Sequence, residues 1–533
     1  MEDLPAPRFV RNSITAAFVL LLTVAVLALP AGIRPLWPAV VALGMVFSTR
    51  SAALSLVAAC LAGLILLLAA PQAAQFKEWI DPEEGGLRKT LLGGWHLGAL
   101  AFTLLLGAFS AVIERSDGLL PLLRARGEVN DRTRKRFLTS LFGLGLLCFF
   151  DGLANALMLG RVARPVADRV GVPRALLAYL VDTTSSAVTC VAFLSTWIVA
   201  QLAFIADYSP LQKPAYLLFV QSIPRNYYCL FALLLAFLVL RRNWLIGPMR
   251  HRLPTPLSES DRAAAQPSGQ LHRALLPLLV LLLSIPAAIL LLHSPGQPPA
   301  DWSEKIRLSL SASTVPAAFV IGSVLALLAA IAFFPRERFR EAPRAALRGA
   351  RQLLPALLIL LLAWVLGSLF SALGTEKVLS EALGDGLPLS FFPAGVFLLA
   401  CAISFVTGTS WGTMGILMPI VLPTAGGMAA AQAAPPELLA TIVPAVIAAV
   451  FGGAVFGDHC SPYSDTTIVS ALASGISTPE HTITQLPYAL LTAGTAVLAG
   501  YLPIALGLSH WLALALGSAI LVGLVFFVPL RRT

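Results

Sequence analysis

The chain has 533 residues, of which 57% are hydrophobic and only 12% are charged, and its mean hydropathy is +0.83. Many of its apolar runs exceed the roughly 18 residues that indicate a spanning helix. This composition excludes a soluble multidomain protein, because no polar stretch is long enough to build a soluble domain. The sequence therefore predicts a single, all-α polytopic membrane domain.

The formal net charge of +10 raises the question of an anionic partner such as nucleic acid. The charge distribution argues against one, because most Lys and Arg fall in loops predicted to be cytoplasmic, as the positive-inside rule describes. The six cysteines lie in apolar segments without C-x-x-C spacing, which argues against a disulfide framework or a zinc site. The bilayer is the partner that the composition indicates.

Spans are expected at residues 14–33, 36–49, 52–71 and 91–113, starting from a cytoplasmic N-terminus. The first run follows two arginines, as in a signal peptide, but it leads directly into more apolar sequence. We therefore expect an uncleaved first helix.

Residues 137–160 are apolar, yet basic residues flank them on both sides, with Arg136 before and Arg161 after. If both flanks stay in the cytoplasm, the segment enters the membrane and turns back as a re-entrant hairpin. The bilayer tolerates such a hairpin only where its irregular backbone is buried or lines a cavity. Residues 174–206 then cross outward and 214–240 return.

The same order recurs after residue 353 with the opposite orientation. Residues 389–425 have no basic flank and are expected to form a second hairpin, entered from outside. Residues 438–475 contain Gly452, Gly453, Gly457 and Pro462, which we expect to break the helix. Such inverted repeats place both polar breaks near the middle of the membrane in secondary transporters.

About 12 transmembrane helices and two hairpins are expected in all. The predicted organisation is N-terminal scaffold helices (1–90), a first repeat (91–240) with hairpin 137–160 and broken helix 174–206, a linker with scaffold helices (241–352), a second repeat (353–508) with hairpin 389–425 and broken helix 438–475, and a C-terminal helix (509–533).

The tripeptide Asp-Thr-Thr occurs in both predicted broken helices, beginning at Asp182 and at Asp465. A carboxylate in hydrocarbon costs roughly 2.5 to 3.5 kcal/mol on insertion scales. Two such carboxylates, one in each predicted broken helix, therefore indicate a duplicated transport site.

Carboxylates, hydroxyls and amides dominate the polar residues of these four segments, and such oxygens suit a hard cation. Asp182 and Asp465 are predicted to bind such a cation. The full set of candidate site residues is Asp151, Asn155, Asp182, Thr183, Thr184, Thr407, Thr409, Ser410, Asp458, His459, Ser461, Asp465 and Thr466.

Some of these residues have a second interpretation. Asp458 could cap a half-helix instead of binding a ligand, and His459 could carry a proton or serve as a hydrogen-bonded packing residue. The stretch GTSWG, Gly408–Gly412, matches a nucleophile elbow, so an intramembrane serine hydrolase pairing Ser410 with His459 is a remote alternative. That elbow requires a strand-to-helix turn in an α/β fold, which nothing in this sequence predicts.

The motifs GDHCSPYSDTT, TQLPYALL, FFDGLANALMLG, LVDTTSSAVTCVAFLSTW, SFVTGTSWGTMGILMPI and GWHLGALAFTLLLGA resemble those of the NhaC family of sodium/proton antiporters, over about residues 91–508. The resemblance implies an ion transporter superfamily fold, in which a transport domain moves like an elevator against a dimeric scaffold, and hence a homodimer. The positions on the family's motifs are Asp151, Asn155, Asp182, Thr183, Thr184, Asp458, His459, Ser461, Asp465 and Thr466. The family's first hairpin commonly reads F-F-D-D-Y-A-N, and Gly152 stands here in place of the second Asp.

We therefore expect a secondary transporter that exchanges Na⁺ for H⁺, with Asp182 and Asp465 as Na⁺ ligands. It is expected to work without a cofactor, in the inner (cytoplasmic) membrane with both termini in the cytoplasm. The alternative is a sodium-coupled carrier or exchanger of a small organic solute, such as an organic acid, an amino acid or a drug.

Overall fold

The computed structural model describes residues 8–69, 73–123, 130–254, 269–292, 301–311, 314–384 and 386–527. Within these ranges the chain forms helices and turns and no β-strand. In the described part of the chain, eleven helical stretches are long and apolar enough to cross a membrane. An all-helical membrane fold was thus correctly predicted.

The N-terminal helices are shorter than the expected spans. Helix α1 ends at Val26, ahead of Pro30, and α2 and α3 are separated only by Arg50 and Ser51. Arg50 has a φ of 56°, and the Ser51 side chain caps α3 by accepting a hydrogen bond from Leu54 N. The helices of this region are α1 (Arg8–Val26), α2 (Trp37–Thr49), α3 (Ala52–Leu68), α4 (Ala73–Trp79), α5 (Gly86–Leu92) and α6 (Gly94–Arg115).

Two interrupted helix pairs follow. A short turn at residues 148–151 joins the first pair, and residues 192–195 interrupt the second. Both interruptions end in a residue that caps the next helix, Asp151 in the first case and Ser195 in the second. The helices are α7 (Asp131–Leu147), α8 (Gly152–Arg169), α9 (Arg174–Val191), α10 (Thr196–Tyr208), α11 (Ala215–Ser222) and α12 (Tyr227–Arg242).

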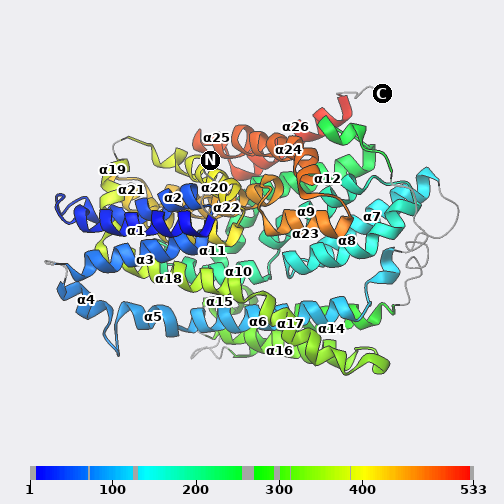
Figure 1. Cartoon of the computed structure of the whole chain (residues 1–533), viewed down its shortest axis with the longest axis horizontal. Helices are drawn as coiled ribbons and strands as arrows, with labels where there is room; N and C mark the ends of the chain where they lie inside the picture. The colour runs from blue at the N-terminus through cyan, green and yellow to red at the C-terminus, as the bar shows by residue number, and fades with distance from the viewer. Residues whose placement is uncertain are drawn as a thin grey trace, which may run out of the picture.

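A layer of long helices covers one side of the molecule, at the bottom of Figure 1. In this layer α6 packs against both α16 and α17, and α14 packs against α16. Gly349 lets α17 approach α6 closely, since a Cβ there would meet the Gly107 carbonyl oxygen. The helices of this segment are α14 (His272–Leu292), α15 (Trp302–Ser311), α16 (Val315–Ala332) and α17 (Glu341–Gln352).

The last third repeats the pattern of an interrupted pair followed by a broken helix. Gly408 and Thr409 join the first pair, and residues 461–464 interrupt the second. The helices are α18 (Leu354–Leu373), α19 (Thr375–Gly384), α20 (Phe392–Thr407), α21 (Ser410–Ala431), α22 (Pro436–Cys460), α23 (Asp465–Ser474), α24 (Thr478–Thr495), α25 (Leu502–Ala505) and α26 (His510–Phe527). A π-helical segment, Ala496–Tyr501, joins α24 to α25.

The glycines expected to break the second broken helix do not break it. Gly452, Gly453 and Gly457 lie inside continuous α22, and only the segment around Pro462 is non-helical. They serve close packing instead, since a Cβ at Gly453 would lie 2.4 Å from Ala400 Cβ of α20. Glycine is tolerated within a helix when it allows another backbone to approach.

The two predicted hairpins differ in length. In the second, both arms, residues 389–407 and 410–431, are long enough and apolar enough to cross a membrane. The first pair, α7 and α8, contains no candidate span among the described residues, because α7 has only 17 residues and the second half of α8 is charged. Re-entrant insertion therefore stays a prediction for both segments.

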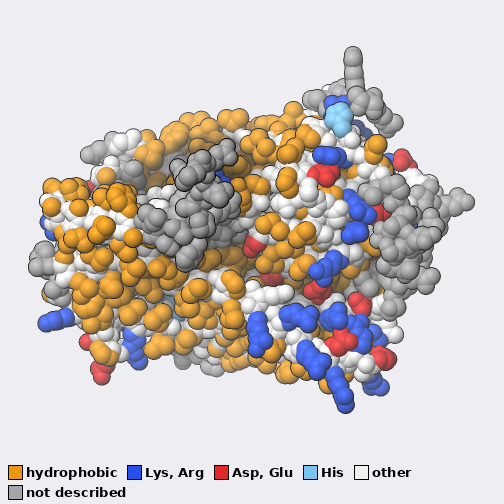
Figure 2. Space-filling model, in the orientation of Figure 1, with side chains coloured by type: hydrophobic (Ala, Val, Ile, Leu, Met, Phe, Trp, Pro, Cys, Tyr) orange, Lys and Arg blue, Asp and Glu red, His pale blue; other side chains and the backbone are white. Residues whose placement is uncertain are grey.

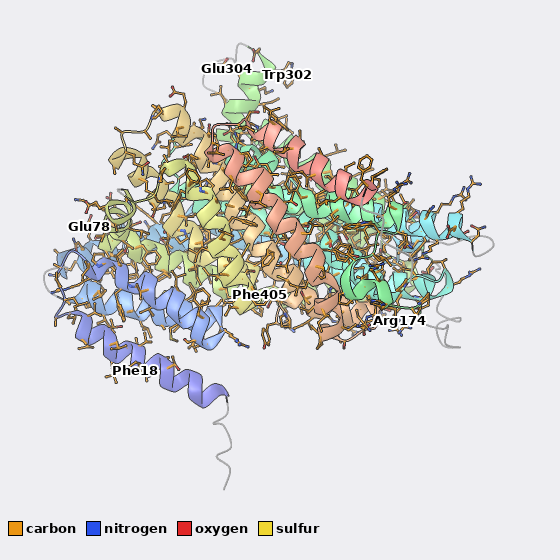
Figure 3. All side chains as sticks on the ribbon, turned by 90° about the horizontal axis from the view of Figure 1, so that it is seen from above. Phe18, Glu78, Arg174, Trp302, Glu304 and Phe405 are labelled. Atoms are coloured by element: carbon orange, nitrogen blue, oxygen red, sulfur yellow. The ribbon has the colours of Figure 1, made fainter. Side chains whose placement is uncertain are left out.

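The surface has one basic end. Lys and Arg gather toward the right of Figure 2, whereas the middle and left are mainly hydrophobic. Arg174 and Glu78 lie toward opposite ends of the long axis, and Phe18 projects from α1 at the periphery (Figure 3). Burial also varies: the α9–α10 segment is 89% buried and α26 only 22%. The broken helix is thus central, with peripheral helices around it.

Candidate functional site

The turn between α7 and α8 touches the break between α9 and α10. Asp151 caps α8 by accepting a hydrogen bond from Ala154 N at 2.8 Å, and its other oxygen lies 3.3 Å from the donating Thr196 hydroxyl. The Thr196 backbone N–H also donates to Phe150 O at 3.1 Å. The turn that joins α7 to α8 is therefore attached to the start of α10, at the break between α9 and α10.

A corresponding contact joins the tip between α20 and α21 to the break between α22 and α23, through a glycine instead of a carboxylate. Gly408 ends α20 with a φ of 64°, and a Cβ there would lie within 2.6 Å of Tyr463 backbone atoms in the α22–α23 break. Only glycine fits both this φ and this approach. Thr409 then caps α21 by accepting from Gly412 N. Each helix-pair tip thus meets a helix break, and the caps are Asp151 in one repeat and Thr409 in the other.

The two Asp-Thr-Thr tripeptides do not occupy matching places. Asp182 lies in the middle of α9, well before the break at residues 192–195, whereas Asp465 is the first residue of α23, directly after the other break. The expectation of equivalent sites was wrong on this point. By position, the residue that matches Asp465 is Thr196, which begins α10.

Asp182 is fully buried, and three donors from the second repeat surround its carboxylate. Ser470 Oγ lies 3.3 Å from Oδ1, while His481 Nε2 and Gln485 Nε2 lie 3.2 and 2.9 Å from Oδ2. Sequence analysis missed these three residues. His481 and Gln485 are four residues apart and so share one face of α24, a spacing in an apolar segment that could have indicated them.

Asp458 is fully buried but incompletely paired. Ser464 Oγ donates to Oδ1 at 3.0 Å, whereas Oδ2 has no hydrogen-bond partner among the described residues. The Ser410 hydroxyl, at the start of α21, lies beside this carboxylate as a possible donor, and no described residue forms a hydrogen bond of normal length with it. Asp458 also binds the broken segment through its carbonyl oxygen, which accepts from the Thr467 hydroxyl. Asp458 therefore stabilises the break between α22 and α23 through Oδ1 and its carbonyl oxygen, while Oδ2 remains available to accept a further ligand.

His459 is hydrogen-bonded to Tyr228 and not to Ser410. Its Nδ1 lies 2.9 Å from the Tyr228 hydroxyl, and its Nε2 has no partner among the described residues. No hydrogen bond joins Ser410 to His459 in the described structure, so the nucleophile–base contact that a serine hydrolase needs is not formed.

Asp465 differs from the other acids because its side chain is exposed, although protein atoms surround it closely. It had been expected to be buried. Its Oδ1 accepts from the Thr466 backbone N–H at 2.8 Å, as suits a carboxylate in the first turn of a helix. The Asp465 carboxylate therefore lies at the protein surface and not in the core.

The remaining candidates have structural hydrogen bonds except Thr183, whose buried hydroxyl has no hydrogen-bond partner of normal length among the described residues. Asn155 Nδ2 donates to Gly145 O and Thr184 O, joining α7 to α9, and its Oδ1 has no partner among the described residues. The Thr184 and Thr407 hydroxyls bond carbonyl oxygens four residues earlier in their own helices. Ser461 Oγ accepts from Tyr463 N, Thr466 Oγ1 pairs with Ser464 Oγ, and Thr183 is buried beside Asp182.

The four acids form one electrostatic group. Asp458 lies within electrostatic reach of Asp182 and Asp465, and Asp465 within reach of Asp151. No three His, Cys, Asp or Glu side chains cluster as a metal site among the described residues. The arrangement instead offers carboxylate, amide and hydroxyl oxygens, which suit a monovalent hard cation or a proton.

Comparison with known proteins identifies the kind of molecule. Residues 177–504 match the model of the Na⁺/H⁺ antiporter family. A Haemophilus influenzae protein described only as uncharacterized is 30% identical over 447 residues, covering 82% of this chain and 84% of its own length. The malate-2H⁺/Na⁺-lactate antiporter of Bacillus subtilis is 40% identical over 98 residues, 17% of this chain and 19% of its own.

Among solved structures, the YdaH transporter of Alcanivorax borkumensis superposes with a TM-score of 0.56 at 14% identity, covering 84% of this chain and 91% of that one. At this identity the likeness concerns the fold alone. Both the family and the fold are those of transporters, which sets the serine-hydrolase alternative aside. The chain is a multi-pass membrane transporter, not an enzyme, and it belongs to the Na⁺/H⁺ antiporter family, the NhaC-type family that its motifs resemble.

Proposed function

We propose that the protein exchanges Na⁺ for H⁺ and that Asp458 is the central ligand. The observation that carries this proposal is the fully buried Asp458 carboxylate, whose Oδ2 has no hydrogen-bond partner of normal length among the described residues and which lies beside the Ser410 hydroxyl. An unpaired buried acceptor is costly unless something binds it. A sodium ion or a proton would remove that cost, and each would exclude the other from the same oxygen.

The donors around Asp182 assign it a different role from the Na⁺ ligand first expected. Its two oxygens already face Ser470, His481 and Gln485. A cation would have to displace these donors before it could bind. We propose that Asp182 holds α9 to α23 and α24 in this conformation, and that Asp465 receives ions from solvent and passes them to Asp458.

The membrane arrangement is proposed on the same basis. The basic end in Figure 2 is assigned to the cytoplasm by the positive-inside rule, with both termini cytoplasmic and the protein in the inner membrane. Two inverted repeats, each with a re-entrant hairpin at a helix break, would form a transport unit that moves against a scaffold in a homodimer. The tip-to-break contacts at Asp151–Thr196 and Gly408–Tyr463 support each repeat as one unit.

Competition between the two ions is the test. In proteoliposomes, the apparent Na⁺ affinity should weaken as pH falls, approaching tenfold per pH unit for each competing proton, because the protonated carboxyl no longer binds the cation. Asp458→Asn should abolish exchange in protein that still inserts and folds. An affinity that stays flat between about pH 6 and 9, with exchange continuing, would reject a shared site.

A sodium-coupled carrier of an organic solute is the second candidate, and one group of residues favours it. Gln201 is buried in α10 with neither amide atom partnered among the described residues. Trp197, one turn earlier on α10, faces Trp411 of α21 with ring centroids 6.4 Å apart. An amide and two indoles could hold a small organic acid, and the named B. subtilis relative exchanges malate and lactate. The proteoliposome assay distinguishes the two, since such a carrier would dissipate a pH gradient only with the solute present.

A further inference from the structure

A basic groove lies between α7 and the end of α12, away from the ion site. It has a volume of about 840 Å³. These two helices lie side by side in the right-hand part of Figure 1. The groove is lined by Asp131, Arg132, Lys135, Arg136, Thr139, Ser140 and Arg241.

The cations of this groove are not neutralised. Arg132, Lys135, Arg136 and Arg241 are exposed, and none forms an ion pair with a carboxylate among the described residues. Arg338, elsewhere on the surface, shows the contrasting case: its guanidinium pairs with Asp117 at 2.8 Å and with Glu341 at 3.2 Å. Four cations against the single acid Asp131 leave the groove ready for an anion, and guanidinium groups match phosphate oxygens geometrically.

An apolar strip continues from the groove along the same two helices. Phe237 lies one turn before Arg241, whose guanidinium stands 6.0 Å from the Phe237 ring centroid. The Phe237 ring packs on Phe142 of α7 at 5.7 Å, and Phe237 and Leu146 remain 38% and 39% exposed. A soluble phosphate would use only the cations. A molecule with a charged head and apolar tails would use both surfaces.

We propose that this groove binds an anionic phospholipid, with its phosphate among Arg132, Arg136 and Arg241 and an acyl chain along Phe237 and Leu146. Basic pockets at the cytoplasmic end of spanning helices are suited to such headgroups, because anionic lipids concentrate in that leaflet. The lipid would contact α7, whose far end leads into the turn that carries Asp151. This site does not depend on which ion the transporter carries.

The test compares two triple variants of the full chain with equal charge. The groove variant carries Arg132→Gln, Arg136→Gln and Arg241→Gln. The control carries Arg336→Gln, Arg344→Gln and Arg351→Gln, three exposed arginines near or on α17. The protein is reconstituted in phosphatidylcholine vesicles with about a fifth phosphatidylglycerol, and the immobilised fraction of spin-labelled phosphatidylglycerol measures its affinity for that lipid. This affinity should fall at least tenfold in the groove variant and less than twofold in the control.

Equal losses in both variants would mean a diffuse charge effect, and no loss in the groove variant would mean no site; either result overturns the proposal. A further arm adds inorganic phosphate at millimolar concentration. Displacement of the labelled lipid by phosphate alone would identify a soluble-anion site instead. If the triple variant fails to fold, the single variants Arg132→Gln and Arg241→Gln should each still lower the affinity several-fold relative to Arg344→Gln.

Discussion

His481 Nε2 lies 3.2 Å from Asp182 Oδ2, with both side chains fully buried. The contact joins α24 to α9, two helices from different halves of the chain. Gln485 and Ser470 donate to the same carboxylate. A single acid of α9 thereby holds both α23 and α24, and its removal should affect both folding and transport.

Asp182→Asn should therefore lower thermal stability as well as exchange. Asparagine keeps the size but turns one acceptor into a donor that faces other donors. Hydrogen bonds to a charged group contribute about 1.5–3 kcal/mol, and we expect a loss of that order together with an exchange rate at least tenfold lower. Thermal unfolding in detergent and exchange in proteoliposomes measure the two effects. Asp131→Asn, an exposed acid outside the site, is the control. A stable, fully active Asp182→Asn protein would show that the Asp182 hydrogen bonds are needed for neither stability nor exchange.

A second link between the halves lies at the other end of α9. Arg174 binds the buried Asp168 at 2.7 Å and also donates to Gly475 O at the end of α23. Breaking a buried pair costs about 3–5 kcal/mol, because the remaining charge stays uncompensated. Arg174→Gln should destabilise the protein by that order.

Arg169→Gln is the matched control, since Arg169 is exposed and lies on the same α8–α9 connection. Equal melting temperatures for the two variants would show that the Arg174–Asp168 pair contributes nothing. Figure 3 places Arg174 near the end of the molecule where other basic residues gather, so a surface role is the natural competing explanation.

The sequence was sufficient for the helical membrane class and for the two interrupted regions, because hydropathy and loop charge report both directly. The cap role offered for Asp458 was wrong, because Asp458 lies inside α22, whereas Asp151, expected only as a site residue, caps α8. The position of the second break was harder to predict. Glycines at 452, 453 and 457 suggested a break there, but the close packing of α20 keeps that helix continuous.

The site itself depended on contacts between distant segments. Asp182 is 288 residues from Ser470 and 299 from His481, and although His481 and Gln485 share one face of α24, no local pattern indicates that this face meets Asp182. The repeated tripeptide misled for a related reason: identical residues stand at different helix positions, one mid-helix and one at a helix start. Sequence similarity within the chain did not imply equivalent geometry.

Membrane topology can be tested with single cysteines. If the first helix pair is re-entrant, cysteines replacing Lys135 and Arg169, at its two ends, should both react with an impermeant maleimide from the cytoplasm. The native cysteines are buried or half-buried, so their background should be low. In the second pair, cysteines at Gly386 and Ala433 should both react from outside. Reaction of Lys135→Cys and Arg169→Cys from opposite sides would contradict the hairpin and the inverted repeat.

Gly152 stands where the first-hairpin motif of the family commonly has its second Asp, and the structure has room for an aspartate side chain there. A Cβ at Gly152 would lie 3.5 Å from Ser185 O and from Thr189 Oγ1, and 3.7 Å from Trp197, all ordinary contacts. The residue begins α8, where the helix dipole favours a carboxylate. Gly152→Asp should therefore fold, unlike Gly145→Asp, whose Cβ would meet Thr184.

The added carboxylate would stand next to Asp151, and Asp151 lies within electrostatic reach of Asp465. An extra charge moved per cycle is worth about 2.3 kcal/mol per 100 mV, so Gly152→Asp should shift either the voltage dependence or the ion preference of exchange. Exchange at several imposed potentials, with Na⁺, Li⁺ and K⁺ compared, measures both, and Gly152→Ala controls for side-chain volume. If Gly152→Asp matches Gly152→Ala at every potential and for every ion, the hairpin carboxylate lies outside the ion path, and Asp458 and Asp465 carry the exchange without it.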